Sequence, residues 1–178
     1  MSSQHGCILF DWGNTLMRVF PEYNGPMFAW PHVEVTPHAL EVMAELKSHW
    51  SFALATNAAD SEEKDIWAAL HRVGLDRYIN KVYCFRKINH KKPSQEFFAY
   101  ILNDLRIDPM DAIMVGDDFE VDVLGASKAG LYAIWLNRLD EKCIKASNHS
   151  TIHDLSELPL AVKVYMKDRR RSQLKING

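Results

Sequence analysis

The amino-acid sequence predicts a three-layer α/β/α fold, in which helices cover both faces of a central parallel β-sheet. Short apolar runs alternate along the chain with longer stretches whose apolar positions recur at helical spacing. Strands that alternate with helices in this way are typical of parallel sheets, because parallel neighbours are joined by crossover helices. The chain has 178 residues, of which 47% are hydrophobic, so we expect residues 1–178 to form one domain with an ordinary core.

Five strands are expected, because five short apolar runs are each bounded by turn residues or by a change of pattern. They are 6–10 (GCILF), 51–55 (SFALA), 81–85 (KVYCF), 111–115 (DAIMV) and 131–135 (LYAIW).

An irregular segment and a helix are predicted between the first two strands. Residues 17–36 are rich in proline, glycine and aromatic residues and predict a short flap over the edge of the sheet. Its aromatic side chains either pack as an ordered loop or form a lid; they are Phe20, Tyr23, Phe28 and Trp30. A helix follows over 37–49, with Thr36 as N-cap and Pro37 at the first helical position.

The second helix is predicted over 61–73 from its start and stop signals. Asp60 with Glu63 three residues later is typical of a helix start, and Gly74 is typical of a helix end. The later helices are expected from Ser94 to about Leu105, from Glu120 to Ala129 before Gly130, and after Ser156.

Composition excludes several classes of partner. The net charge of −2 provides no global field for nucleic acid or a membrane surface, and no apolar run is long enough to span a bilayer. The basic residues gathered in the C-terminal tail, 167–178, indicate a solvated helix end or a frayed tail. Three cysteines, Cys7, Cys84 and Cys143, are too few for a disulfide framework, and the first residues lack a signal-peptide pattern. We therefore expect a cytoplasmic protein without nucleic-acid or membrane partners; the oligomeric state stays open.

Polar side chains follow several of the predicted strands. Because the carboxyl ends of parallel strands meet at one edge of the sheet, where ligands bind in such folds, we expect these side chains to gather. They are Asp11, Thr15, Thr56, Asn57, Asp117 and Asp118, joined by Lys92, which precedes the helix that Ser94 opens. Each alone has an ordinary structural explanation, such as a turn cap or a solvated lysine. Together, acids with a lysine and a hydroxyl suit a divalent cation and an anion such as phosphate.

The order of these motifs resembles that of the haloacid dehalogenase (HAD) superfamily of phosphatases and related hydrolases. The resemblance extends over about residues 6–160 and rests on four stretches: DWGNT, LATN, KKPSQEFF and GDDFEVDVLGASKAG. It implies a Rossmann-like HAD core and, because only the segment 17–36 replaces a large cap, a capless or minimal-cap member.

The resemblance also implies a metal site. Asp11 would be the nucleophile that forms an aspartyl-phosphate, and it would bind Mg²⁺ with the backbone carbonyl of Gly13 and the carboxylate of Asp117. Asp118 or Asp122 would be a secondary acid, which acts through water or holds the motif lysine. The implied substrate is a phosphate ester of a small molecule or of a protein.

A phosphate pocket is implied beside this metal site. Thr56 would donate a hydrogen bond to the phosphoryl oxygens, and Lys92 would neutralise charge on the nucleophile and the phosphate. Asn57 and the backbone N–H of Trp12 are placed in the same pocket. Thr15 would brace the motif loop.

Gly13 departs from the pattern, because family phosphatases carry an aspartate there that acts as general acid and base. General acid–base help is worth roughly 10²–10⁴-fold, so turnover is expected to be slow unless a residue such as His32 or His90 replaces it. Two alternatives stay open. One is an impaired pseudo-phosphatase that acts as a binding or regulatory module. The other is a phosphonate or C-halogen hydrolase, although the lysine and tyrosine of those branches are absent.

Overall fold

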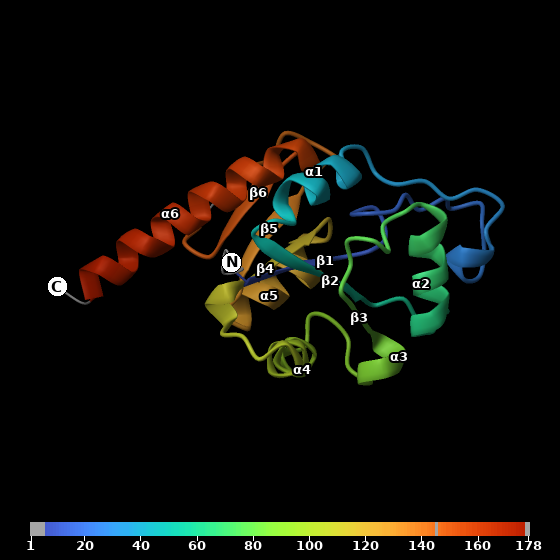
Figure 1. The fold of residues 1–178 in the computed structure, drawn as a ribbon, viewed down its shortest axis with the longest axis horizontal. Helices are drawn as coiled ribbons and strands as arrows, with labels where there is room; N and C mark the ends of the chain where they lie inside the picture. Colours follow the sequence, from blue (N-terminus) through green and yellow to red (C-terminus); the bar gives the residue numbers. More distant parts are fainter. Residues whose placement is uncertain (1–5, 145, 177–178) are drawn as a thin grey trace.

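A computed structural model describes residues 6–144 and 146–176, and it confirms the predicted α/β fold with a parallel central sheet (Figure 1). Six strands form one sheet in the order β3-β2-β1-β4-β5-β6, and every neighbouring pair is parallel. The strands are β1 (Gly6–Phe10), β2 (Trp50–Thr56), β3 (Lys81–Cys84), β4 (Ala112–Gly116), β5 (Tyr132–Leu136) and β6 (His149–Ile152).

The central position of β1 determines where the site lies. β1 pairs with β2 on one side and with β4 on the other, and Phe10 is in register with Leu54 and with Val115. The residues that follow these three strands therefore meet at the carboxyl end of the sheet.

The edge strand β6 was not predicted, because its sequence HSTI contains only one strongly apolar residue.

Helices cover both faces of the sheet (Figure 1). They are α1 (Ala39–Leu46), α2 (Glu63–Arg72), α3 (Phe85–Ile88), α4 (Gln95–Leu105), α5 (Gly125–Lys128) and α6 (Leu158–Ile176). The buried side chains of α1, α2 and α6 pack with Ile8 and Phe10 of β1. Those of α4 and α5 pack with Cys7 and Leu9 on the opposite face. This alternation along β1 shows that a buried strand is covered from both sides, which accounts for its continuous apolar run.

The predicted start of the first helix is wrong. The helix begins at Ala39, and its N-cap is His38 in a left-handed conformation with φ of 64°. Thr36 does not cap it, because its hydroxyl donates a 2.6 Å hydrogen bond to the carbonyl oxygen of Thr15. The Thr36 side chain, which the local pattern assigned to the helix N-cap, therefore forms a tertiary hydrogen bond instead.

The predicted start of the second helix is also wrong. Glu62 is the N-cap, and it exchanges capping-box hydrogen bonds with Asp65. Asp60 lies two residues before this cap and plays no part in it. The predicted end is confirmed, since Gly74 follows the helix in the left-handed region with φ of 72°.

The predicted helix over 120–129 is divided. Phe119–Leu124 form a π-helical turn, and α5 follows directly. The side chain of Asp118 accepts a 2.9 Å hydrogen bond from the backbone N–H of Val121 and so caps this turn. The predicted cap of α4 is confirmed, because Ser94 accepts from Phe97 N.

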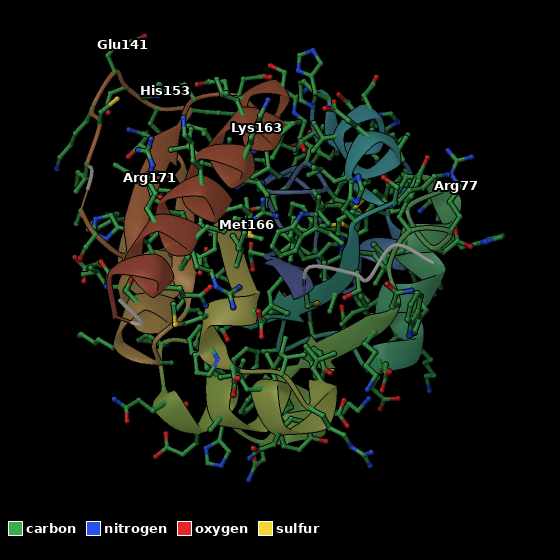
Figure 2. The ribbon with its side chains drawn as sticks, turned by 60° about the vertical axis from the view of Figure 1, so that its left-hand side comes forward. Arg77, Glu141, His153, Lys163, Met166 and Arg171 are labelled. Carbon is green, nitrogen blue, oxygen red and sulfur yellow. The ribbon has the colours of Figure 1, made fainter. Side chains whose placement is uncertain are left out.

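The predicted basic tail continues α6 through Ile176, and residues 177–178 lie outside the described part of the chain. α6 projects beyond the sheet in Figure 1, and Figure 2 shows Lys163, Met166 and Arg171 along it. Among the described residues, no helix combines the length and the apolar character that crossing a bilayer requires.

Candidate active site

A buried ion-pair network lies at the carboxyl end of β1. The Lys92 Nζ atom is 2.7 Å from Asp11 Oδ1 and 2.6 Å from Asp122 Oδ1. The side chains of Lys92 and Asp122 are 1% and 2% exposed, whereas that of Asp11 is 15% exposed. Lys92 therefore joins two carboxylates, and only one of them reaches toward solvent.

Two features position this network. The side chain of Asn57 accepts from Lys92 N and donates to Lys92 O, each at 2.9 Å, which holds the loop before α4 against the end of β2. Gly116 at the end of β4 makes room for Asp122, because an added Cβ at Gly116 would overlap the Asp122 carboxyl group. Asn57, which sequence reasoning placed among phosphate-binding residues, therefore uses both ends of its amide on Lys92.

Three acids converge beside Lys92. Asp11, Asp117 and Asp122 each offer a carboxylate oxygen, and these oxygens lie within 4.8 Å of one another. Asp118 is not part of this cluster, since it is exposed and caps the following turn. Of the two secondary acids named from the sequence, Asp122 is thus the one that lies in the cluster.

The acid cluster carries more negative charge than Lys92 neutralises. Burial raises the pKa of Asp122 to about 7, and Asp11 adds to the rise while Lys92 opposes it. Burial also raises the pKa of Asp117, again with a contribution from Asp11 and against a hydrogen bond from Thr15. For Lys92, burial alone would lower the pKa, but the carboxylates of Asp11 and Asp122 outweigh it and raise the pKa above its ordinary value.

The donor set fits a hard divalent cation. Mg²⁺ prefers carboxylate and carbonyl oxygens and is held by few protein ligands beside substrate and water. Three converging carboxylates, two of them with a raised pKa, are chemically suited to such an ion. Sequence reasoning named Asp11, Asp117 and the carbonyl of Gly13 as ligands.

Hydroxyl groups brace the loop after β1. Thr15 donates to Asp117 Oδ1 at 3.2 Å, and its own carbonyl accepts from Thr36. Trp12 is 3% exposed, and its indole N–H donates to Met17 Sδ at 3.1 Å. The turn that carries Asp11 is therefore fixed by both side chains and backbone.

A hollow of about 230 Å³ opens in front of Asp11. Its lining residues come from the loop after β1, the segment 17–36 and the loop after β2; they are Asp11, Trp12, Gly13, Val19, Gly25, Met27, Trp30, Thr56, Asn57, Ala58, Asp60 and Ser61. Thr56 lies here with its hydroxyl accepting from Ala58 N at 3.1 Å. Lys92 does not line the hollow and reaches it through its contact with Asp11. Larger hollows occur elsewhere, but Asp11, Asp117 and Asp122 are not among the residues that line them.

Val19 occupies the space beside Gly13. A Cβ atom added at Gly13 would lie 2.9 Å from Val19 Cγ2. Val19 is 38% exposed, so its side chain can shift toward solvent. The absence of a carboxyl group at position 13 is therefore accompanied by an apolar side chain in the adjacent space.

The segment 17–36 forms an ordered aromatic wall. The ring of Phe20 contacts those of Tyr23, Trp30 and His32, with centroids 5.6, 6.5 and 5.3 Å away. Arg72 of α2 donates to the carbonyl oxygen of Trp30 at 2.6 Å and anchors the segment. His32 is 3.4 Å from Glu34, and neither His32 nor His90 lines the hollow.

Two charged residues near the site were missed from the sequence. Asp60 was assigned to a helix start, although it lines the hollow with Asp11. Arg138 lies two residues after β5; burial lowers its pKa, while Asp117 and Asp154 act in the opposite direction. The signal for Arg138 was available, because it also follows a predicted strand.

The chain belongs to the haloacid dehalogenase-like hydrolases, since the model of that family matches residues 8–136. Among curated relatives, human N-acylneuraminate-9-phosphatase is 27% identical over 131 residues, 72% of this chain and 52% of that protein. Ribulose-1,5-bisphosphate 5-phosphatase from Halopiger xanaduensis is 30% identical over 110 residues, 61% of this chain and 45% of that protein. The chain spans about half the length of these relatives.

Solved structures agree on the fold. An uncharacterized protein from Listeria monocytogenes superposes with a TM-score of 0.79 at 28% identity, covering 91% of this chain and 99% of that one. A HAD phosphatase from Thermococcus onnurineus superposes with a TM-score of 0.63 at 25% identity, covering 73% and 59%. The relatives thus include phosphatases, and this chain is similar to them across its core.

Proposed function

We propose that this protein is an Mg²⁺-dependent phosphohydrolase that transfers the phosphoryl group of a small phosphate ester to Asp11. The observation that carries the proposal is the contact of Lys92 with Asp11 at 2.7 Å, inside a cluster of three acids. A lysine held on one carboxylate oxygen leaves the second oxygen of Asp11 available for attack on phosphorus.

In the first step, transfer of the phosphoryl group to Asp11, three side chains have separate roles. A carboxylate oxygen of Asp11 attacks phosphorus, and the bond to the leaving oxygen breaks. The Lys92 ammonium offsets the negative charge that gathers on Asp11 and the phosphoryl group, and it acts from a buried position where such an interaction is strong. The Thr56 hydroxyl at the end of β2 orients a phosphoryl oxygen.

Asp11, Asp117 and the carbonyl of Gly13 would hold Mg²⁺, with Asp122 next to them. When bound, the ion would neutralise phosphate charge and orient the substrate. Asp122 keeps Lys92 in place through its 2.6 Å contact.

The substrate is expected to be a small-molecule phosphate. The hollow in front of Asp11 measures about 230 Å³, which suits a phosphoryl group with a compact leaving group. Relatives are named as phosphatases of N-acylneuraminate 9-phosphate, ribulose 1,5-bisphosphate and glyceraldehyde 3-phosphate. A protein phosphate remains the second substrate class.

A cytoplasmic location forms part of the proposal. Cys7 and Cys84 are buried free thiols and Cys143 is an exposed one, so the described chain holds no disulfide. Free thiols of this kind are usual in reducing compartments.

Gly13 supports a second candidate function, a pseudo-phosphatase that binds metal and phosphate without efficient turnover. Position 13 offers no proton-transferring group, and Val19 fills the adjacent space. The phosphonate and C-halogen alternatives find no such support, because the lining of the hollow, over the part of the chain that the structure describes, contains neither a lysine nor a tyrosine.

The test is hydrolysis of p-nitrophenyl phosphate with and without Mg²⁺ by the wild type, Asp11→Asn and Gly13→Asp. We expect Mg²⁺-dependent turnover that Asp11→Asn abolishes. Turnover by Gly13→Asp alone would instead support the pseudo-phosphatase. Val19→Ala should accompany Gly13→Asp in a further variant, because it removes the 2.9 Å conflict. Equal rates for the wild type and Asp11→Asn would exclude the proposed nucleophile.

A further inference from the structure

The second half of the proposed reaction lacks an assigned base. Water must be deprotonated before it can release phosphate from an aspartyl-phosphate, and Gly13 cannot do this. Among the described residues that line the hollow, only Asp11 and Asp60 have carboxyl side chains, and none is a histidine, lysine or cysteine. Since Asp11 would carry the phosphoryl group at that stage, Asp60 is the one carboxylate of the lining that is free to accept a proton.

The contacts of Asp60 leave it available. Its Oδ1 atom accepts a 3.1 Å hydrogen bond from the hydroxyl of Ser61, which is fully buried. Asp60 itself is exposed and lines the hollow, and it forms no ion pair with any residue in the described ranges 6–144 and 146–176. A carboxylate without a cation partner keeps an oxygen lone pair for water.

Asp60 does not cap the helix that follows it. The helix after it is capped by Glu62 and Asp65, which satisfy each other's backbone N–H groups. The capping role that its sequence context indicates is therefore taken by other residues. Besides its hydrogen bond from Ser61, Asp60 has its place on the wall of the hollow.

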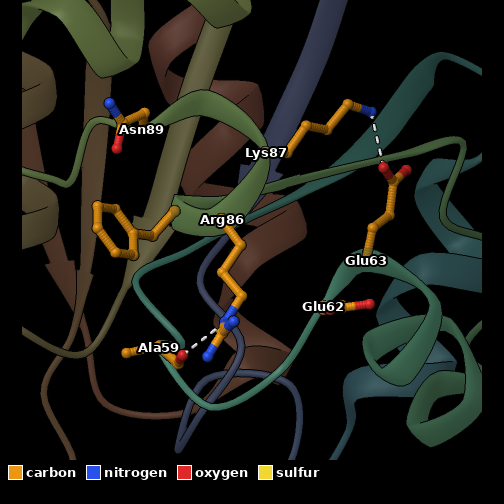
Figure 3. A pocket seen from close by; sticks show the side chains of 7 residues that line it. Ala59, Glu62, Glu63, Arg86, Lys87 and Asn89 are labelled. Atoms are coloured by element: carbon orange, nitrogen blue, oxygen red, sulfur yellow. Dashed lines mark hydrogen bonds and ion pairs between the residues drawn. The ribbon is translucent and has the colours of Figure 1, made fainter.

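The loop that carries Asp60 is held at two points. Asn57 is fixed to the backbone of Lys92, and Arg86 Nε donates a 2.8 Å hydrogen bond to the carbonyl oxygen of Ala59, as Figure 3 shows. Lys87, the next residue, pairs with Glu63 at 3.0 Å at the start of α2. These contacts hold the chain on either side of Asp60, and the hydrogen bond from Ser61 restrains its carboxylate. A positioned base is more effective than a mobile one.

We infer that Asp60 is the general base that activates water for hydrolysis of the phosphorylated Asp11, in place of the residue missing at position 13. The carboxylate of Asp60 takes one proton from water as the water oxygen bonds to phosphorus. The bond between phosphorus and Asp11 breaks, which returns the Asp11 carboxylate and releases inorganic phosphate. Asp60 then gives its proton to solvent. The inference rests on the proposed function and names a residue for its second step.

Rapid-mixing kinetics with p-nitrophenyl phosphate and Mg²⁺ separate the two steps. In Asp60→Asn, nitrophenolate should appear in a burst equal to the enzyme concentration, because transfer to Asp11 does not need the base. Steady-state turnover should then fall by about 10²–10⁴-fold. Intact-protein mass spectrometry after an acid quench should show the phosphorylated form as the dominant species, whereas the wild type shows little.

Glu22→Gln is the matched control, since Glu22 is an exposed acid on the segment 17–36 that does not line the hollow. It removes the same charge and should leave the rate unchanged. Wild-type turnover in Asp60→Asn would overturn the inference, and so would loss of the burst together with turnover. If the wild type shows neither burst nor turnover, or Asp11→Asn retains both, the proposed function itself fails and the assignment of Asp60 fails with it.

Discussion

Each end of the sheet has a lysine–aspartate ion pair, and the two pairs have the same N···O distance but differ in their exposure to solvent. At the carboxyl end, Lys92 Nζ lies 2.7 Å from Asp11 Oδ1, and the two side chains are 1% and 15% exposed. At the amino end, Lys81 Nζ lies 2.7 Å from Asp104 Oδ2, with exposures of 44% and 43%. Tyr83 adds a 2.6 Å hydrogen bond to the second pair.

Distance alone therefore does not separate a buried pair from a surface pair. Water screens the charges of Lys81 and Asp104, so the net contribution of that pair to stability is small. Lys92 is enclosed with two acids, and removing it would leave buried negative charges without compensation. The carboxyl end of the sheet thus contains buried charges whose desolvation costs free energy, which is typical of sites that bind charged ligands.

The largest effect is expected from Lys92→Met. With metal removed by EDTA, the free energy of unfolding should fall by about 3–5 kcal/mol, because Asp11 and Asp122 lose the Lys92 ammonium that they share. Hydrolysis of an aryl phosphate should fall by about 10²–10³-fold. Urea unfolding and steady-state kinetics measure the two effects, and a variant as stable and active as the wild type would remove the distinction between the two ends of the sheet.

Asp122 is expected to matter less than Lys92. Asp122→Asn keeps the shape of the side chain but removes the charge that holds Lys92, so activity should fall by about 10–100-fold, the value of one charged hydrogen bond. Gly116→Ala should act in the same direction, since the new Cβ would displace Asp122. Kinetics that match those of the wild type in both variants would show that Asp122 is dispensable for holding Lys92.

The pH dependence of Mg²⁺ binding tests the charge of the cluster. Carboxylates bind metal in the ionised form, and the pKa of Asp122 is raised to about 7. Protonation of Asp122 below that pH would remove a negative charge beside the proposed ligands Asp11 and Asp117, so the affinity should rise from pH 6 to pH 8, by at most about tenfold per unit for one displaced proton. Calorimetry in buffers of different ionisation enthalpy should detect proton release, which Asp122→Asn should reduce. Affinity that does not change with pH would contradict the raised pKa.

The smallest effect is expected at the amino end. Lys81→Met should change the stability by no more than about 1 kcal/mol, because the pair that it removes is exposed. Phosphatase activity should be unchanged. A loss comparable to that of Lys92→Met, measured under identical conditions, would show that burial does not determine the difference between the two pairs.

Sequence reasoning was most successful where the signal is local. The five apolar runs identified five of the strands. Asp11, Thr56 and Asp117, which follow these strands, and Lys92, which precedes α4, lie near one another at the carboxyl end of the sheet. The parallel arrangement of the sheet brings strand ends together regardless of details in between. The motif order therefore carried information about three-dimensional proximity.

The errors arose where tertiary contacts decide. Thr36 and Asp60 have the side chains of helix caps, but one hydroxyl bonds to Thr15 and one carboxylate lines the hollow. The strand His149–Ile152 is paired in parallel with β5, and its own residues give little indication of a strand. Local patterns cannot distinguish a capping acid from one that faces a site, since the same residue types serve both.

The central claim, that Asp11 is the nucleophile, is tested most directly by locating the phosphoryl group. Asp60→Asn would be mixed with p-nitrophenyl phosphate and Mg²⁺, quenched in acid, digested and sequenced by mass spectrometry. We predict one phosphorylated peptide, with the group on Asp11 and lost on treatment with hydroxylamine, as an acyl phosphate requires. A phosphoryl group on a residue other than Asp11 would contradict this claim, and so would turnover that Asp11→Asn retains.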